Sequence, residues 1–188
     1  MIVNNEFYEI EIVTDETYTI NSADNKFYDY IYNPSNLKNS DFKNVFSIKI
    51  KSTDKEISIA LIGHICSSVE NYAILKDDVL IILQNKTISK IALATGELLS
   101  CKNIGTFGSN FSIYEISTGY IIHGEIEILK LDFDFEIEWS FSGKDIFATL
   151  NDKRAFELCS ECIKLYDFEN NYYEIDFDGK LIFEKEAE

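Results

Sequence analysis

The sequence predicts an all-β fold built from repeated four-stranded antiparallel meanders. Composition, alternation of apolar and polar residues, and an internal repeat all support this prediction. Of the 188 residues, 14% are aromatic, mostly Phe and Tyr, and these residue types favour half-buried strands over helix interiors. No segment combines apolar residues at helical spacing with a cap at either end. We therefore expect little helix.

Alternation is clearest from Leu131 to Trp139, where odd positions are apolar and even positions are acidic. A period of two predicts a strand or a tight hairpin with one apolar and one acidic face. Similar short runs are bounded by turn-forming Asn, Asp and Gly residues. They cover residues 46–50, 57–61, 79–83, 87–93, 120–123, 162–166 and 172–177.

An eleven-residue segment recurs, and each copy resembles a strand end, a tight turn and another strand. The copies are residues 90–100, 130–140 and 174–184, with a weaker one at 49–59. With Ile50, Ile91, Leu131 and Ile175 as anchors, the spacings are 41, 40 and 44 residues. Four short strands and their turns use about 40–45 residues, the length of one propeller blade.

In each of the three clear copies the next-to-last residue is large and apolar, namely Leu99, Trp139 or Phe183. A lone four-stranded unit cannot bury its own face. We therefore expect these three residues to pack one blade against the next.

The length suits one domain with a substantial core, so we expect a single β-repeat domain over residues 1–188. The repeat units are expected at approximately 46–70, 71–104, 111–146 and 154–186. Residues 1–45 are expected to be irregular, because residues 21–44 are rich in Asn, Asp and Ser and contain the only proline, Pro34. A small closed ring, an incomplete propeller and a β-sandwich of meanders all remain open.

Residues 91–99, Ile-Ala-Leu-Ala-Thr-Gly-Glu-Leu-Leu, resemble the blade signature of quinoprotein-type (PQQ-like) β-propellers. In that family an apolar-Asp-Ala-x-Thr-Gly turn leads to a terminal Trp. The resemblance covers the last two-thirds of the chain and implies a small or incomplete propeller-like fold. Quinone-binding propellers usually have about six to eight blades, whereas this chain has room for about four. No residues match the family's calcium or quinone ligands, so we expect no cofactor and no dehydrogenase activity.

The chain is strongly acidic, with 33 Asp and Glu against 17 Lys and Arg and a net charge of −16. The charge is spread along the chain, so it belongs to the folded surface. Such a surface repels nucleic acid and anionic membranes and attracts basic proteins. Acidic groups also simply keep proteins in solution.

The N-terminus has no basic region followed by an apolar run, and no stretch is long enough to span a membrane. We therefore expect a cytoplasmic protein. The four cysteines lack the dense spacing of a disulfide scaffold, so we expect free thiols, as in a reducing compartment. They are Cys66, Cys101, Cys159 and Cys162.

Catalytic and metal motifs are weak. Cys159 and Cys162 have the spacing of half a zinc site, but a closed site needs four ligands. The only complements are His64 with Cys66, or His123 with Cys101. The repeat places Cys159 and Cys162 in a hairpin turn instead, so we expect no metal. Neither a nucleophile elbow nor a phosphate-binding loop is present, and we expect no enzyme.

Six carboxylates lie in the two most acidic repeat copies. They are Asp132, Asp134, Glu136, Glu138, Asp176 and Asp178. Oxygen ligands for a hard cation and paired catalytic carboxylates are possible uses of such residues, but no complete motif surrounds them. We predict that they form a solvated face that binds a partner.

The function predicted best is a non-catalytic protein that binds a basic partner through this acidic face. The specific hypothesis is a bacterial immunity protein that neutralises a basic toxin such as a nuclease. The resemblance to this class is one of general type and not of a sequence motif. One alternative is a propeller-like scaffold for another protein. A less favoured alternative is a carbohydrate-active or carbohydrate-binding protein. The oligomeric state is not predicted.

Overall fold

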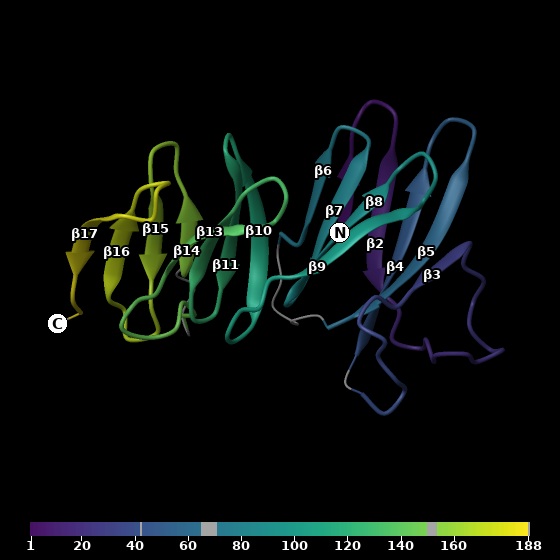
Figure 1. Ribbon diagram of the computed structural model, residues 1–188, viewed down its shortest axis with the longest axis horizontal. Coiled ribbons are helices and arrows are strands. Elements are labelled where there is room, and N and C mark those ends of the chain that lie inside the picture. Colours follow the sequence, from purple (N-terminus) through teal and green to yellow (C-terminus); the bar gives the residue numbers. More distant parts are fainter. Residues whose placement is uncertain (42, 65–70, 150–153, 188) are drawn as a thin grey trace. The chain divides into compact units, whose positions relative to one another are not determined.

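The computed structural model describes residues 1–41, 43–64, 71–149 and 154–187. These residues form 17 β-strands and no helix (Figure 1), so no described segment is a helix able to span a bilayer. The strands make one five-stranded and three four-stranded sheets. The predicted fold class is confirmed, since the chain is all-β and consists of antiparallel meanders of the propeller-blade type.

The chain divides into two compact units, Met1–Asn103 and Ile104–Glu188. The N-terminal unit contains sheets A and B, and the C-terminal unit contains sheets C and D. Each unit has a hydrophobic core of its own. The expectation of one domain over residues 1–188 stays a prediction.

Sheet A has the strand order β1-β2-β4-β5-β3. Its strands are β1 (Ile2–Asn4), β2 (Glu9–Thr14), β3 (Tyr30–Tyr32), β4 (Asn44–Lys51) and β5 (Glu56–Gly63). An antiparallel meander is formed by β1, β2, β4 and β5. The short strand β3 pairs in parallel with β5 at the edge of the sheet. Residues 1–45 therefore supply strands, which corrects the expectation of an irregular segment. The reason is that Ile10 and Ile12 alternate with glutamates and are fully buried.

Sheets B, C and D each run in chain order with antiparallel neighbours. Sheet B contains β6 (Ala73–Lys76), β7 (Val79–Gln84), β8 (Thr87–Ala92) and β9 (Leu98–Asn103). Sheet C contains β10 (Asn110–Ile116), β11 (Gly119–Gly124), β12 (Ile128–Leu131) and β13 (Ile137–Phe141). Sheet D contains β14 (Phe156–Leu158), β15 (Ile163–Tyr166), β16 (Tyr172–Ile175) and β17 (Leu181–Lys185).

The internal repeat appears in the hydrogen-bond register. Between the third and fourth strands of sheets B, C and D, the register shifts directly before the anchor residue, which is Ile91, Leu131 or Ile175. Such a bulge bends the strand and aims the following turn. Ile50 also lies on the third strand of its meander, but its register continues without a shift.

When the eleven-residue copies are aligned without a gap, the copy in sheet B is out of step by one residue. Trp139 and Phe183 pair with the residue before the anchor, and in sheet B that partner is Ser100. The cause is a longer turn: the Ala92 N–H donates to the Glu97 carbonyl five residues on. In sheet C the corresponding bond spans four residues. Leu99 is therefore out of step and is 51% exposed.

Trp139 packs one sheet against the next within the C-terminal unit, as expected. Its indole N–H donates to the Phe177 carbonyl oxygen of sheet D at 3.0 Å. Its ring covers Gly179, where an added Cβ would lie 2.7 Å from the indole. Leu99 and Phe183 do not have this role, since both are about half exposed, at 51% and 50%. That part of the expectation is wrong.

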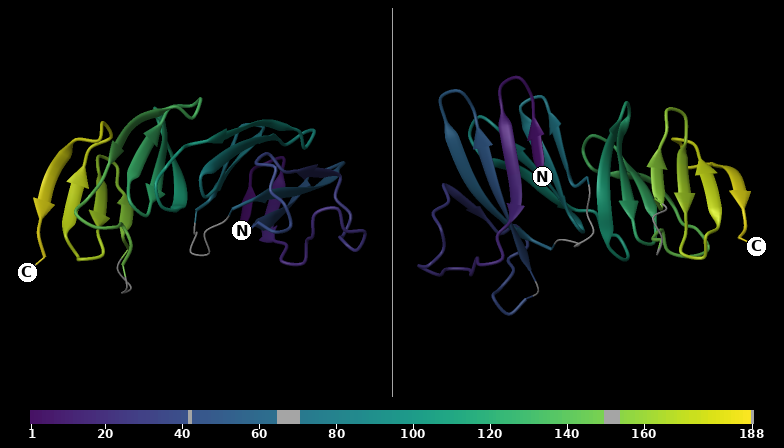
Figure 2. Two further views of the ribbon diagram at one scale, coloured as in Figure 1. Left: turned by 60° about the horizontal axis from the view of Figure 1, so that its bottom comes forward. Right: turned by 180° about the vertical axis from the view of Figure 1, so that it is seen from behind.

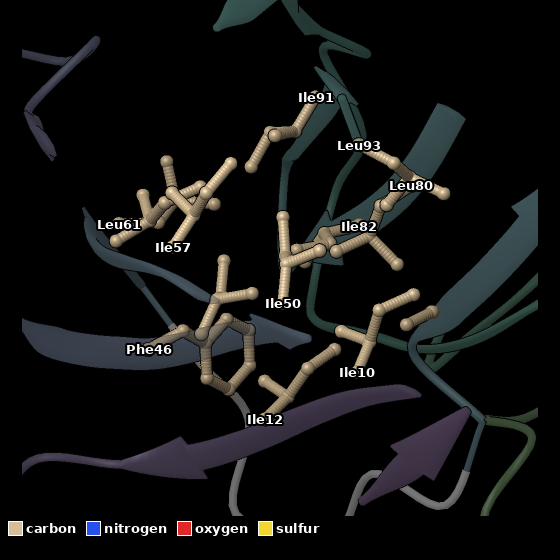
Figure 3. Packing of buried hydrophobic residues seen from close by; sticks show 13 residues of the cluster. Ile10, Ile12, Phe46, Ile50, Ile57, Leu61, Leu80, Ile82, Ile91 and Leu93 are labelled. Carbon is tan, nitrogen blue, oxygen red and sulfur yellow. The ribbon is translucent and has the colours of Figure 1, made fainter. Parts of the chain in front are cut away.

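The core of the N-terminal unit lies between sheets A and B. Buried side chains from β2, β4 and β5 meet those from β7 and β8 and from Leu93. Figure 3 shows these residues pointing toward one another, including Ile10, Ile12, Phe46, Ile50, Ile57, Leu61, Leu80, Ile82, Ile91 and Leu93. Period-two alternation on both sheets creates this shared face.

Part of the opposite face of sheet A is covered by residues 15–29 and 33–41, which we call the cap segment. Tyr18 and Tyr28 pack with Val45, Ala60 and Ile62 in a second cluster. The segment can be followed in purple and blue in Figure 2. Sheet A is thus buried on both faces where β4 and β5 carry Val45, Ala60 and Ile62, whereas the outward side chains of β2 stay exposed.

Candidate interaction surface

The six predicted partner-binding residues lie on two equivalent hairpins of the C-terminal unit, which we call the acidic hairpins. Residues 132–138 connect β12 to β13 in sheet C and begin β13, and residues 176–180 connect β16 to β17 in sheet D. Each is the turn between the third and fourth strands of its meander. Equivalent positions in the repeat therefore carry the acidic residues.

Asp132 and Asp176 shape these turns. Oδ1 of Asp132 accepts hydrogen bonds from the N–H groups of Asp134 (2.9 Å) and Glu136 (2.8 Å). Oδ1 of Asp176 accepts equivalent bonds from Asp178 (3.0 Å) and Lys180 (2.8 Å). Aspartate favours turns because its side chain can satisfy backbone donors in this way.

The alternating run 131–139 forms the tight hairpin that the pattern allowed, but its odd positions do not share one buried face. Phe135 is 2% exposed, whereas Phe133 and Ile137 are 41% and 48% exposed. The backbone of Phe135 has a φ of +64°, and Gly179 in the equivalent hairpin has +78°. A residue with positive φ breaks the pleat, so the period of two does not continue through the turn.

Glu138 neutralises a nearly buried cation. Its carboxylate lies 2.7 Å from Nζ of Lys130, a residue only 7% exposed. Asp134, Glu136, Glu138 and Asp178 are the exposed members of the predicted set. These four carboxylates face solvent, and Glu138 also pairs with Lys130, while the half-buried Asp132 and Asp176 hold the hairpin turns.

The two acidic hairpins lie next to each other. Trp139 follows the first hairpin and donates its indole N–H to Phe177 within the second. The ring also covers Gly179 of the second hairpin. The structure therefore brings together two groups of carboxylates that are about 40 residues apart in sequence.

A pocket of about 360 Å³ opens beside the second acidic hairpin, at the end of sheets C and D where their turns gather. Its lining residues are Ile116, Ser117, Thr118, Lys130, Leu158, Cys159, Ser160, Phe177 and Asp178. Of these, the sequence singled out only Asp178 as a binding residue. The sequence offered only an indirect signal for the other lining residues: the repeat places the turns at 117–118 and 159–160 at the same end of neighbouring meanders.

Cys159 and Cys162 close the turn between β14 and β15, with the Cys159 N–H donating to the Cys162 carbonyl at 2.9 Å. Burial, together with the neighbouring Cys159 and Glu174, raises the pKa of the Cys162 thiol. Cys101, Cys159 and Cys162 are free thiols, as expected. Cys66 lies outside the described residues.

His123 serves a packing role in sheet C. Nε2 lies 3.0 Å from the Phe147 carbonyl oxygen, and the ring stacks on Phe156 at 5.0 Å. Burial lowers its pKa to about 4. Within the described ranges, no three His, Cys, Asp or Glu side chains gather as a metal site.

A group of aromatic residues lies on the face of sheet D opposite its core, and we call it the aromatic face. It consists of Tyr166, Tyr172 and Phe183, with ring centroids 4.9 Å and 6.0 Å apart in succession. The Tyr172 hydroxyl donates to Glu174. Burial, followed by this hydrogen bond, raises the pKa of Tyr172.

No protein-family model matches the chain, and no curated protein matches its sequence. Solved structures do match. The computationally designed protein Ika8 has 10% identity over 77% of this chain and 46% of its own, with a TM-score of 0.50. BamB from Moraxella catarrhalis has 11% identity over 66% and 36%, with a TM-score of 0.44. The dihydro-heme d1 dehydrogenase NirN has 15% identity over 77% and 35%, with a TM-score of 0.49.

BamB and NirN are β-propeller proteins. The chain spans about a third to a half of the length of these three structures. At such identities the similarity concerns the fold alone.

Proposed function

We propose that the chain is a protein-binding module without catalytic activity, and that its acidic hairpins bind a basic protein partner. The supporting observation is the placement of Asp134, Glu136 and Asp178, which are exposed on two adjacent turns. Asp132 and Asp176 hold the backbone of those turns through hydrogen bonds. Rigid presentation favours binding because fewer groups must be ordered on association.

Net charge supports the same class of partner. A charge of −16 attracts a basic protein over long range and speeds its encounter. The same field repels the phosphates of nucleic acids and of anionic lipids. A basic protein in the cytoplasm is therefore the partner we propose.

A narrower form of this proposal is a bacterial immunity protein that neutralises a basic toxin such as a nuclease. The acidic hairpins would cover the basic surface with which such a toxin holds its substrate. Charge complementarity is the support for this form. If the partner is a nuclease, an equimolar amount of the chain should abolish its activity, and undiminished activity of the complex would contradict this form.

The experiment is affinity capture from native extract at low and high salt, with the wild-type chain and the variant Asp134→Lys/Glu136→Lys. We expect a basic protein that binds at low salt and is lost at high salt, since salt screens exposed charges. The variant should fail to capture it. A partner retained by the variant would contradict the choice of surface, and a partner that is not basic would favour a general scaffold.

The matched control is Glu6→Lys/Asp54→Lys, which reverses two exposed carboxylates in hairpin turns of sheet A. Both variants change the net charge by the same amount. The control should keep the partner. Equal loss in both variants would show that total charge governs binding, and the acidic hairpins would then have no special role.

A further inference from the structure

The pocket between sheets C and D combines two kinds of wall. Ser117, Thr118 and Ser160 contribute hydroxyl groups from two hairpin turns. Ile116, Leu158 and Phe177 contribute apolar surface. A ligand that fills this space therefore needs both hydrogen-bonding groups and apolar surface.

The charges around the pocket disfavour an anionic ligand. Lys130 is one of the lining residues. Glu138 already neutralises the Lys130 ammonium at 2.7 Å, and Asp178 adds a carboxylate to the lining. An anion would therefore meet an excess of negative charge, in addition to the charge of −16 on the chain. The hydroxyl groups and apolar side chains of the lining favour a neutral ligand over a cation, because a charged group is costly to place against apolar surface.

The hydrogen-bonding capacity of the pocket suits several hydroxyl groups at once. A lysine ammonium has three N–H donors, and the bond to Glu138 uses one of them. A serine or threonine hydroxyl both donates and accepts, and the Asp178 carboxylate accepts. Sugar rings carry hydroxyl groups around the rim and C–H groups on their faces, which matches both walls.

We propose that this pocket binds one neutral monosaccharide unit. Its volume of about 360 Å³ lies at the lower end of the range for small-molecule sites, which suits one ring. The site goes beyond binding of a protein partner and does not depend on it. Of the six predicted partner-binding carboxylates, Asp178 alone is among the lining residues of this pocket.

The chain carries its own reporter, because Trp139 is the single tryptophan and its indole donates to the Phe177 carbonyl at the pocket. The test is a titration with glucose, galactose, mannose and N-acetylglucosamine, followed by tryptophan fluorescence and by amide NMR shifts. At least one sugar should give saturable changes, with a dissociation constant in the millimolar range. The shifted amides should be those of residues 116–118, 158–160 and 177–178.

The variants Thr118→Val and Ser160→Ala remove one hydroxyl each from the lining. Each should weaken binding of the best sugar about three- to tenfold, the usual effect of one lost hydrogen bond. The matched control is Thr53→Val, which removes an exposed hydroxyl from the turn between β4 and β5. This control should bind like the wild-type chain, and unchanged amide spectra elsewhere would show that the variants are folded.

Three results would overturn the proposal. The first is the absence of saturable change with every sugar up to about 100 mM, a concentration far above that needed for millimolar affinity. The second is tighter binding of sulfate or of free lysine than of any sugar. The third is equal affinity in the pocket variants and the Thr53→Val control. A disaccharide that binds more tightly than its monosaccharide would identify a glycan end as the ligand, and equal affinity would identify a free sugar.

Discussion

Sheets A and D differ in what covers the face opposite the core of their unit. The outer face of sheet A is covered over β4 and β5 by the cap segment, in which Tyr18 and Tyr28 are 9% and 7% exposed. The outer face of sheet D carries the aromatic face, in which Phe183 is 50% exposed. Stacked repeat units bury their faces against neighbours, and a terminal unit needs a cap on its outer side. Sheet A has that cap, whereas sheet D presents aromatic side chains to solvent.

The cap segment is anchored by a polar group as well as by packing. The Tyr28 hydroxyl donates to Oδ2 of Asp15 at 2.6 Å, and Lys26 lies 3.5 Å from the same oxygen. Burial opposes ionisation of Asp15, but the hydrogen bonds from Tyr28 and Thr17 and the charge of Lys26 lower its pKa overall. The cap is thus a small core with its own charged anchor.

The largest expected difference between the two ends concerns their aromatic residues. Tyr28→Ala should lower the free energy of unfolding by about 3 kcal/mol, because it empties a buried site. Phe183→Ala should lower it by less than about 1 kcal/mol, because half of the ring already contacts water. Denaturant unfolding measures both changes. Equal losses would show that the two faces do not differ in burial.

The contact between an aromatic ring and a hairpin glycine gives the next largest effect. Gly179→Ala would place a Cβ 2.7 Å from Trp139, whereas Gly105→Ala meets no atom within 4 Å. Both glycines have positive φ, so alanine strains both backbones by about 1 kcal/mol. Gly179→Ala should cost about 2 kcal/mol more in unfolding free energy.

The matched case in the N-terminal unit is Gly96, where an added Cβ would lie 2.9 Å from Tyr30. Gly96→Ala should therefore resemble Gly179→Ala. Similar losses at Gly179 and Gly105 would contradict the role of Trp139 in joining sheets C and D.

Acid should weaken the C-terminal unit through His123. Its folded pKa of about 4 lies below the ordinary value of 6.5, so the unfolded chain binds a proton first. The contribution to stability is present above pH 6.5 and is lost as the pH falls toward 4. The full shift would correspond to about 3 kcal/mol, and we expect about 2 kcal/mol because the ring is partly exposed.

The measurement is the free energy of unfolding between pH 7 and pH 4. His123→Gln should remove most of the pH dependence in this interval, whereas His64→Gln should keep it because His64 is exposed. A pH profile that is unchanged in His123→Gln would contradict this assignment.

The sequence predicted strands from residue 46 onward because each meander buries residues with a period of two. Runs such as 79–83 and 172–177 therefore correspond to β7 and β16. It did not predict β1, β2 or β3, which lie in the segment expected to be irregular. For β3 the reason is that Tyr30–Tyr32 pairs with a strand almost 30 residues later. Local alternation carries no signal for such a pairing. One extra turn residue in sheet B also moved Leu99 out of register.

The candidate site was predictable in part. The repeat placed the acidic residues at equivalent positions and predicted that Trp139 packs one meander against the next, and Trp139 does join the two acidic hairpins. The inward role of Asp132 and the ion pair of Glu138 with Lys130 depend on turn geometry and on packing between sheets. The pocket beside the second acidic hairpin depends on three turns that meet only in the folded chain.

The most direct test of the central claim is the association rate of the captured basic partner with three forms of the chain, measured at several salt concentrations. We predict that Asp134→Lys/Glu136→Lys slows association about tenfold or more and weakens its salt dependence, since electrostatic steering contributes that much to encounter rates. Glu6→Lys/Asp54→Lys should slow it far less. Equal rates for the two variants would contradict binding through the acidic hairpins.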